Sequence, residues 1–197
     1  MNVIFFIKSK TVDISNYTIK DIPGSSGRLD VISRCILSAI LDDNAFEKNI
    51  QIWTFLDNYG TFIFEPELFN YKNFPKSEIL LTDYFVDFLQ KFSSKKDLDS
   101  NPLKFIKKSE KNIIDAITYY KNLKYAIYIL DEKGRNFFKL RNNIQKIKNI
   151  IFIVGNQEGD FIESRKLLAL KLPRISIGNQ LYLASSVIRL LKLHLIA

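Results

Sequence analysis

The residues best suited to chemistry stand near the start of the chain, where a loop rich in glycine and serine meets a helical pattern. The loop contains Gly24 and Gly27, and Arg28 and Asp30 follow it. Amide groups at the start of a helix, together with a guanidinium group, favour binding of phosphate or another anion. A loop serine that caps the helix, with Asp30 at the positive end of its dipole, explains the serines and the acid without any ligand. Both interpretations stay open, and Arg28 favours the anion.

Two further glycines follow apolar segments that resemble buried strands. Gly155 comes directly after residues 150–154, and Gly178 comes directly after residues 175–177. Ligands of open α/β sheets lie beyond the carboxyl ends of the strands, and a glycine there lets a ligand approach the backbone. Turns that follow strands also use glycine for conformational reasons, and no dinucleotide or P-loop fingerprint surrounds either position. The pair therefore indicates a ligand site without identifying the ligand.

The composition limits the classes of function. A chain of 197 residues with a net charge of +8 is expected to form one domain that attracts polyanions, nucleic acid above all, although a solvated basic surface explains the charge too. Cys35 is the only cysteine and His194 the only histidine, so we expect no disulfide and no metal site. The first residues lack the pattern of a signal peptide, and charges interrupt the apolar run 181–196. We therefore expect a cytoplasmic protein without a membrane span.

The elements that must position these residues alternate between strands and helices. Apolar runs predict strands over 2–7, 49–56, 61–64, 125–130, 149–154 and 174–177. Periodic patterns predict helices over 28–41, 77–92, 109–123, 135–147, 162–170 and 181–196. Residues 66–76 look irregular, and 93–102 is a polar connector. This alternation predicts an α/β fold with a mainly parallel sheet.

Aromatic and basic side chains offer a second, weaker indication of nucleic-acid binding. Five aromatic residues close together either stack on unpaired bases or fill the core, and we favour the core: Phe62, Phe64, Phe69, Tyr71 and Phe74. A small lysine cluster is expected to be a solvated face: Lys107, Lys108 and Lys111.

Three segments carry a resemblance to a known family. Residues 21–35 (DIPGSSGRLDVISRC), residues 151–155 with Gly159, and residues 175–185 (ISIGNQLYLAS) occur in the order seen in archaeal tRNA (pseudouridine-54-N1) methyltransferases of the SPOUT superfamily. The chain resembles these proteins over nearly its full length. The resemblance implies a single SPOUT domain over 1–197, whose C-terminal part, about 124–197, is threaded as a trefoil knot.

The resemblance also implies a cofactor, partners and site residues. S-adenosylmethionine would bind in the knot of a homodimer, and the last helix would form core and dimer interface through Leu183, Val187, Leu190, Leu191 and Leu195. The implied cofactor residues are Leu130, Gly155, Ile177, Gly178, Asn179, Gln180, Leu181, Tyr182, Leu183 and Val187.

The resemblance places the opening loop against RNA. Arg28 and Arg34 are the implied RNA-binding residues, with Arg28 also at the reacting base, and Asp30 would position or deprotonate the pseudouridine N1–H. The target would be the T-loop of tRNA. Two alternatives remain open: a SPOUT pseudouridine N1-methyltransferase that acts on ribosomal RNA, or a SPOUT-like RNA-binding protein without catalysis. The second is suggested by residues 156–159 (NQEG), which depart from the Asp-His and Gly-Leu-Pro pattern of the family.

Overall fold

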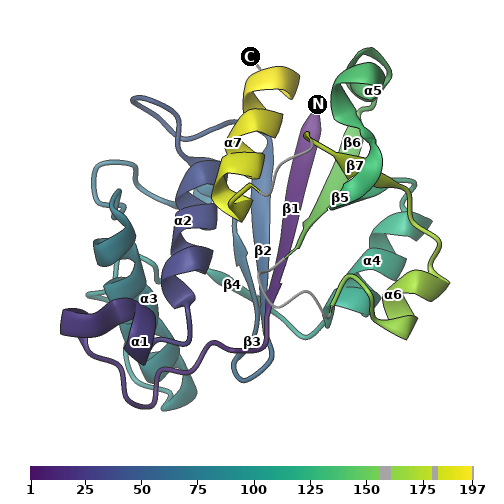
Figure 1. The fold of residues 1–197 in the computed structure, drawn as a ribbon. Coiled ribbons are helices and arrows are strands. Elements are labelled where there is room, and N and C mark those ends of the chain that lie inside the picture. The colour runs from purple at the N-terminus through teal and green to yellow at the C-terminus, as the bar shows by residue number, and fades with distance from the viewer. Residues whose placement is uncertain (156–160, 179–181, 197) are drawn as a thin grey trace.

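The structure, a computed structural model, describes residues 1–155, 161–178 and 182–196. In this part of the chain seven strands form one sheet in the order β4-β3-β2-β1-β6-β5-β7, with helices on both faces (Figure 1). The strands are β1 Asn2–Ser9, β2 Ile50–Leu56, β3 Gly60–Phe64, β4 Lys107–Ser109, β5 Ala126–Asn136, β6 Asn149–Val154 and β7 Arg174–Ser176. The helices are α1 Ile22–Ser25, α2 Leu29–Ile40, α3 Glu78–Ser93, α4 Ile113–Asn122, α5 Phe137–Ile144, α6 Arg165–Ala169 and α7 Ala184–Leu195.

The sheet is parallel across five strands and antiparallel at one edge. β1 pairs in parallel with β2 and with β6, so that Phe5 lies between Ile52 and Phe152. β5 pairs in parallel with β6 and β7, whereas β3 and β4 run antiparallel to their neighbours. The mainly parallel α/β sheet predicted from the sequence is therefore confirmed.

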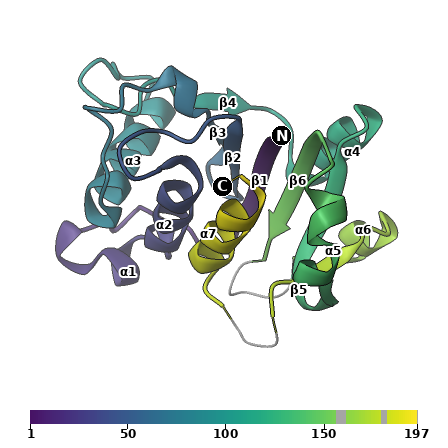
Figure 2. The same ribbon diagram turned by 90° about the horizontal axis from the view of Figure 1, so that it is seen from above.

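Both faces of the sheet are covered, which explains why its strands are apolar without polar alternation. Successive residues of β1 point to opposite faces, so that Phe5 joins a core formed with α2, α3, α5 and α7, and Phe6 joins a core formed with α4 and α6. Figure 2 shows the two layers, with α2, α3 and α7 on one side and α4 on the other. α2 and α7 pack side by side, and the ribbon shows both helices beginning at the carboxyl edge of the parallel strands.

Several predicted boundaries are wrong, each for a local reason. The predicted helix 109–123 begins only at Ile113, because residues 107–109 pair with β3 as an unpredicted edge strand. The helix predicted from 135 begins at Phe137, because β5 continues to Asn136 along β7. The last helix begins at Ala184 rather than at residue 181.

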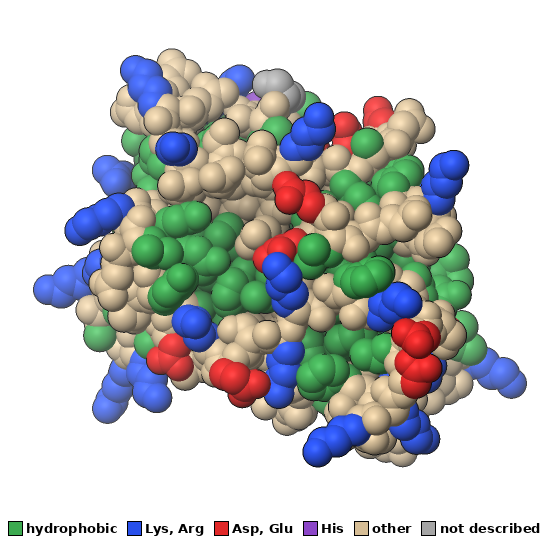
Figure 3. All heavy atoms as spheres, turned by 180° about the vertical axis from the view of Figure 1, so that it is seen from behind, with side chains coloured by type: hydrophobic (Ala, Val, Ile, Leu, Met, Phe, Trp, Pro, Cys, Tyr) green, Lys and Arg blue, Asp and Glu red, His purple; other side chains and the backbone are tan. Residues whose placement is uncertain are grey.

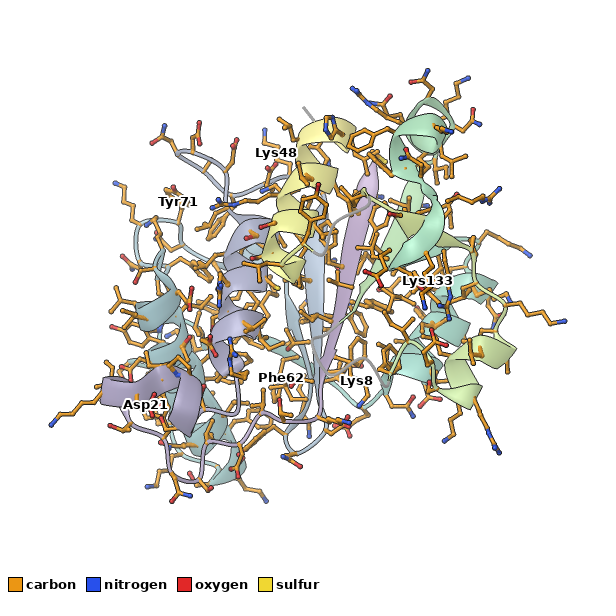
Figure 4. The ribbon with its side chains drawn as sticks, in the orientation of Figure 1. Lys8, Asp21, Lys48, Phe62, Tyr71 and Lys133 are labelled. Carbon is orange, nitrogen blue, oxygen red and sulfur yellow. The ribbon has the colours of Figure 1, made fainter. Side chains whose placement is uncertain are left out.

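The aromatic cluster belongs to the core, as predicted. Phe62, Phe64, Phe69 and Phe74 are buried, and Phe62 packs edge-on against Phe85 of α3 with ring centroids 5.9 Å apart. Tyr71 is only partly buried and lies near the surface (Figure 4).

The last helix also supplies core, as predicted, through its residues Leu191 and Leu195, which are buried. Within the described ranges, no helix is long and apolar enough to span a membrane. The same residues contain no group of three or more His, Cys, Asp or Glu side chains arranged to hold a metal ion.

Candidate active site

A cavity of about 340 Å³ opens at the carboxyl ends of β5, β6 and β7. Its walls come from Leu130 of β5, from Val154 and Gly155 at the end of β6, from the turn after β7, and from the first two turns of α7. This volume lies within the range of small-molecule sites, and its position is where open parallel sheets bind ligands. We refer to it as the cofactor cavity.

Most described residues of the predicted cofactor set line this cavity. They are Leu130, Gly155, Ile177, Gly178, Tyr182 and Val187. Leu183 does not appear among the lining residues, because it stands at the N-cap of α7 with its side chain exposed. Asn179, Gln180 and Leu181 lie outside the described residues, as does the unusual turn 156–159.

The two strand-end glycines are required for space rather than for an unusual backbone conformation. A Cβ at Gly155 would lie 2.6 Å from Cδ1 of Ile162, and a Cβ at Gly178 would lie 3.3 Å from the ring of Tyr182. Neither glycine has a positive φ. In this structure the side chains of Ile162 and Tyr182 lie against the two glycines, and the approach of a ligand to the backbone there stays a prediction.

An ion-pair network fixes the wall beside β7. Arg174 donates hydrogen bonds to the carboxylate of Asp131 and to Oε1 of Glu163, the second at 2.8 Å. These bonds join β5, the segment 161–164 and β7 around the cavity. The hydrogen bond that Arg174 donates to Glu163 raises the pKa of its guanidinium, and the one to Asp131 adds to this, together outweighing the lowering by burial, so the arginine stays charged. The sequence analysis missed this network, although Asp131 directly follows a predicted strand.

The register between β5 and β7 shifts after Leu130. Leu130 and Arg135 both pair with Ile175, so residues 131–134 form an excursion between two contacts with the same strand. A Cβ at Gly134 would lie 2.5 Å from the backbone nitrogen of Ile175, a distance that no side chain tolerates. Gly134 therefore permits a close approach of the β5 backbone to that of β7 here. Lys133, at the tip of this excursion, is labelled in Figure 4.

The residues predicted to face RNA gather at the start of α2. Asp30 is only 2% exposed, and its carboxylate accepts hydrogen bonds from Arg28 Nε at 3.2 Å and from Arg34 Nη2 at 3.4 Å. Arg34 also pairs with Glu78 of α3 at 3.0 Å. The structure thus brings Arg28, Asp30 and Arg34 together. None of the three is among the described residues that line the cofactor cavity.

The loop before α2 folds differently from the expected open anion cradle. Residues 22–25 form the short helix α1, and the Gly24 amide donates to the carboxylate of Asp21 at 3.1 Å. The Leu29 amide donates to Ser26 Oγ at 3.2 Å, so one of the two serines serves the helix start, as predicted. The anion next to Arg28 is the chain's own Asp30, which removes the need for a ligand to explain that arginine.

A solved structure shares this fold. The crystal structure of Archaeoglobus fulgidus Nep1 bound to S-adenosylhomocysteine superposes with a TM-score of 0.64, covering 98% of this chain and 97% of that chain at 12% identity. The protein therefore shares the fold of that structure, a mainly parallel α/β sheet with a ligand-sized cavity at the carboxyl edge of its sheet.

The whole chain, residues 1–197, matches the family described as "Putative SAM-dependent RNA methyltransferase", and it belongs to that family. Membership confirms the predicted class of enzyme and its dependence on S-adenosylmethionine. Among curated relatives, a tRNA (pseudouridine(54)-N(1))-methyltransferase of Thermococcus onnurineus is 28% identical over 93% of this chain and 92% of its own. One of the same name from Methanococcus aeolicus is 30% identical over 83% and 81%.

Proposed function

We propose that this protein transfers the methyl group of S-adenosylmethionine to N1 of pseudouridine 54 in the T-loop of tRNA. The observation that carries the proposal is the cofactor cavity, whose described walls contain six of the residues that the family resemblance implied. The names of the relatives, which match over most of their own length, support the same target.

The residues of the cavity fit the proposed cofactor. Leu130, Ile177 and Val187 provide apolar surface against which an adenine ring packs. Glu132 and Glu163 supply carboxylates that accept hydrogen bonds from ribose hydroxyl or ammonium groups. When bound, the cofactor supplies an electrophilic methyl group, and the protein contributes position and the exclusion of water.

At the start of α2, we assign the binding of RNA to Arg28 and Arg34. Side-chain exposure is 47% for Arg28 and 34% for Arg34, so both guanidinium groups reach solvent. Asp30 is buried and both its oxygens accept from arginine, which favours a positioning role over direct removal of the N1 proton. Asp30 then sets the orientation in which Arg28 meets a phosphate or the target base.

Three further properties are part of the proposal. The C-terminal part of the chain is proposed to be threaded as a trefoil knot, as the family resemblance implies. Leu183 and Leu193 of the last helix and its cap are 52% and 61% exposed, which supports pairing of two copies through α7. Because the proposed substrate is a tRNA, we also propose that the enzyme acts in the cytoplasm.

The alternatives from the sequence analysis are not favoured by any observation. Nothing in the described residues distinguishes ribosomal RNA as a target, and the turn that suggested loss of catalysis lies outside them.

A direct experiment distinguishes the proposed function from both alternatives. The protein is incubated with methyl-labelled S-adenosylmethionine and either total tRNA or total ribosomal RNA, and nucleosides are analysed by mass spectrometry. We expect 1-methylpseudouridine in tRNA alone; label in ribosomal RNA alone, or in neither, contradicts the proposal.

A further inference from the structure

A second cavity, of about 480 Å³, lies between the β2–β3 turn, the connection from β4 to α4, and the residues around the start of α6. It shares no described lining residue with the cofactor cavity. The two cavities nevertheless meet at one short segment, because Ile162 and Glu163 line the first while Phe161 and Ser164 line the second. We refer to this second site as the lysine cavity.

The lysine cavity is positively charged. Its described lining contains four cations and two carboxylates: Lys8, Lys108, Lys111, Lys166, Asp57 and Glu110. Lys8 pairs with Asp57. Nζ of Lys108 lies 3.2 Å from Oε1 of Glu110, whose side chain is 90% exposed. This ion pair therefore contributes little to stability, and a stronger anion can replace Glu110 beside Lys108. The described lining therefore carries two more cations than carboxylates.

The backbone that carries two of these lysines is held rigidly. Thr61 Oγ1 donates to the carbonyl of Lys111 at 2.8 Å, and the Lys111 amide donates to Ser109 Oγ at 3.2 Å. β4 pairs with β3, so Lys108 is anchored opposite Phe62. Because the scaffold is fixed before any ligand arrives, binding an anion here requires ordering only of the lysine side chains.

The rest of the cavity wall is apolar and aromatic. Phe55, Ile113 and Phe161 line it, and the Lys8 ammonium stands 6.0 Å from the centroid of the Phe161 ring. Aromatic rings beside lysines suit a nucleotide, because the ring faces accept a base while the ammonium groups accept the phosphate.

Lysine and aromatic pairs continue outward from the cavity. The Lys108 ammonium lies 5.5 Å from the Phe92 ring centroid, and the Lys104 ammonium lies 5.5 Å from that of Phe105, whose side chain is 52% exposed. The space-filling view from behind shows Lys and Arg side chains around apolar patches on the face that carries α4 (Figure 3). A surface that extends beyond one nucleotide favours a strand of RNA over a free mononucleotide.

We propose that the lysine cavity binds a nucleotide of the substrate RNA other than the one that is methylated. Lys108 and Lys166 hold its phosphate, and Phe161 contacts its base or ribose. The segment 161–164 separates this nucleotide from the cofactor cavity. The proposal rests on RNA as the substrate, and it adds a second contact surface on the opposite side of that segment from the cofactor.

The test compares two double variants of equal charge. Lys108→Ala with Lys166→Ala removes two cations from the lysine cavity, while Lys146→Ala with Lys148→Ala removes two exposed cations between α5 and β6. Binding of unmodified tRNA is measured by fluorescence anisotropy between 50 and 200 mM KCl, and binding of S-adenosylmethionine by calorimetry. For the lysine-cavity variant we expect tRNA affinity about tenfold below that of the control. The slope of log K against log[salt] should also be smaller in magnitude by about 1.5 than in the control.

The binding of S-adenosylmethionine should be unchanged in both double variants. Equal tRNA affinity and equal salt slopes in the two variants would overturn the proposal. Because both substituted lysines are exposed, the variants should fold, and Lys166→Glu alone provides an independent check with the same expected direction. Binding is measured without turnover, so tRNA that is bound through these lysines but never methylated would contradict the proposed function and leave this inference standing.

Discussion

Arg28 and Asp30 form a paired contact at the start of α2, with Arg28 Nε 3.2 Å from Oδ1 and Arg28 Nη2 3.3 Å from Oδ2. Arg28 occupies the left-handed region at φ 69°, a conformation that few residues other than glycine adopt. The buried carboxylate therefore compensates a strained backbone and fixes a guanidinium at the carboxyl edge of the sheet. This arrangement makes Asp30 a residue that acts through Arg28.

Replacing Asp30 tests the positioning role. Asp30→Asn keeps the shape but removes the charge that both arginines contact, so we expect single-turnover methylation of tRNA to fall at least tenfold. The free energy of unfolding should fall by about 1.5–3 kcal/mol, the usual contribution of a hydrogen bond to a charged group. Affinity for S-adenosylmethionine should not change. Arg28→Lys, which retains the charge but loses the paired geometry, should lower the rate as well. An unchanged rate in Asp30→Asn would remove this residue from the account.

The two glycines of the opening loop should respond differently to alanine. Gly27 has φ +57°, and a Cβ there would lie 1.9 Å from the backbone oxygen of Thr11, so Gly27→Ala should destabilise the fold by about 2–4 kcal/mol. A Cβ at Gly24 would lie 2.2 Å from Oδ2 of Asp21, and this side chain can rotate away. Gly24→Ala should therefore cost about 1 kcal/mol. Urea denaturation of both variants checks the order, and equal losses would contradict it.

Gly155 offers a test of the cofactor cavity. Gly155→Ala pushes the end of Ile162 aside and adds a methyl group to the cavity wall, so we expect affinity for S-adenosylmethionine to fall at least tenfold. In the double variant Gly155→Ala with Ile162→Val, the shorter side chain at position 162 relieves the contact with the new Cβ. The added methyl group remains in the cavity wall. Calorimetry should show that affinity remains low in the double variant. Full recovery would mean that the cofactor does not approach Gly155.

Alkaline pH should destabilise the protein in a defined window. Burial raises the pKa of the Cys35 thiol from 9.0 to about 12, and burial, followed by Asp83, raises the pKa of Tyr17 from 10.0 to about 12. The unfolded chain loses these protons first, so between about pH 9 and 12 the folded state binds more protons and stability falls as pH rises. Cys35→Ala should flatten the decline between pH 9 and 10 in urea titrations. An identical slope in this variant would contradict the assigned cause.

Strands β1, β2, β3 and β6 could be predicted from sequence because they are buried on both faces. The long helices could be predicted because each has an apolar stripe. β4 could not, because Lys107 and Lys108 are charged and form a strand only through pairing with β3. The cofactor cavity was located through Gly155 and Gly178, whose small size matters in the folded chain. Arg174 was missed, because its partners Asp131 and Glu163 are distant in sequence and meet only after the sheet assembles.

The opening loop was expected to meet an anion, and the structure supplies one from the chain itself. The sequence suggested an external anion beside Arg28, whereas Arg28 pairs with Asp30, and the functional role of both residues stays a prediction. The short helix α1 was not foreseen, because four residues are too few to show a helical period.

The central claim is that one domain with this cavity methylates a single kind of nucleoside. The most direct measurement is single-turnover transfer of labelled methyl groups from S-adenosylmethionine to two tRNA transcripts that differ only at position 54, one with pseudouridine and one with uridine. The account predicts label at N1 of pseudouridine 54 and none in the uridine transcript. Equal labelling of both transcripts, or labelling of neither, would contradict it.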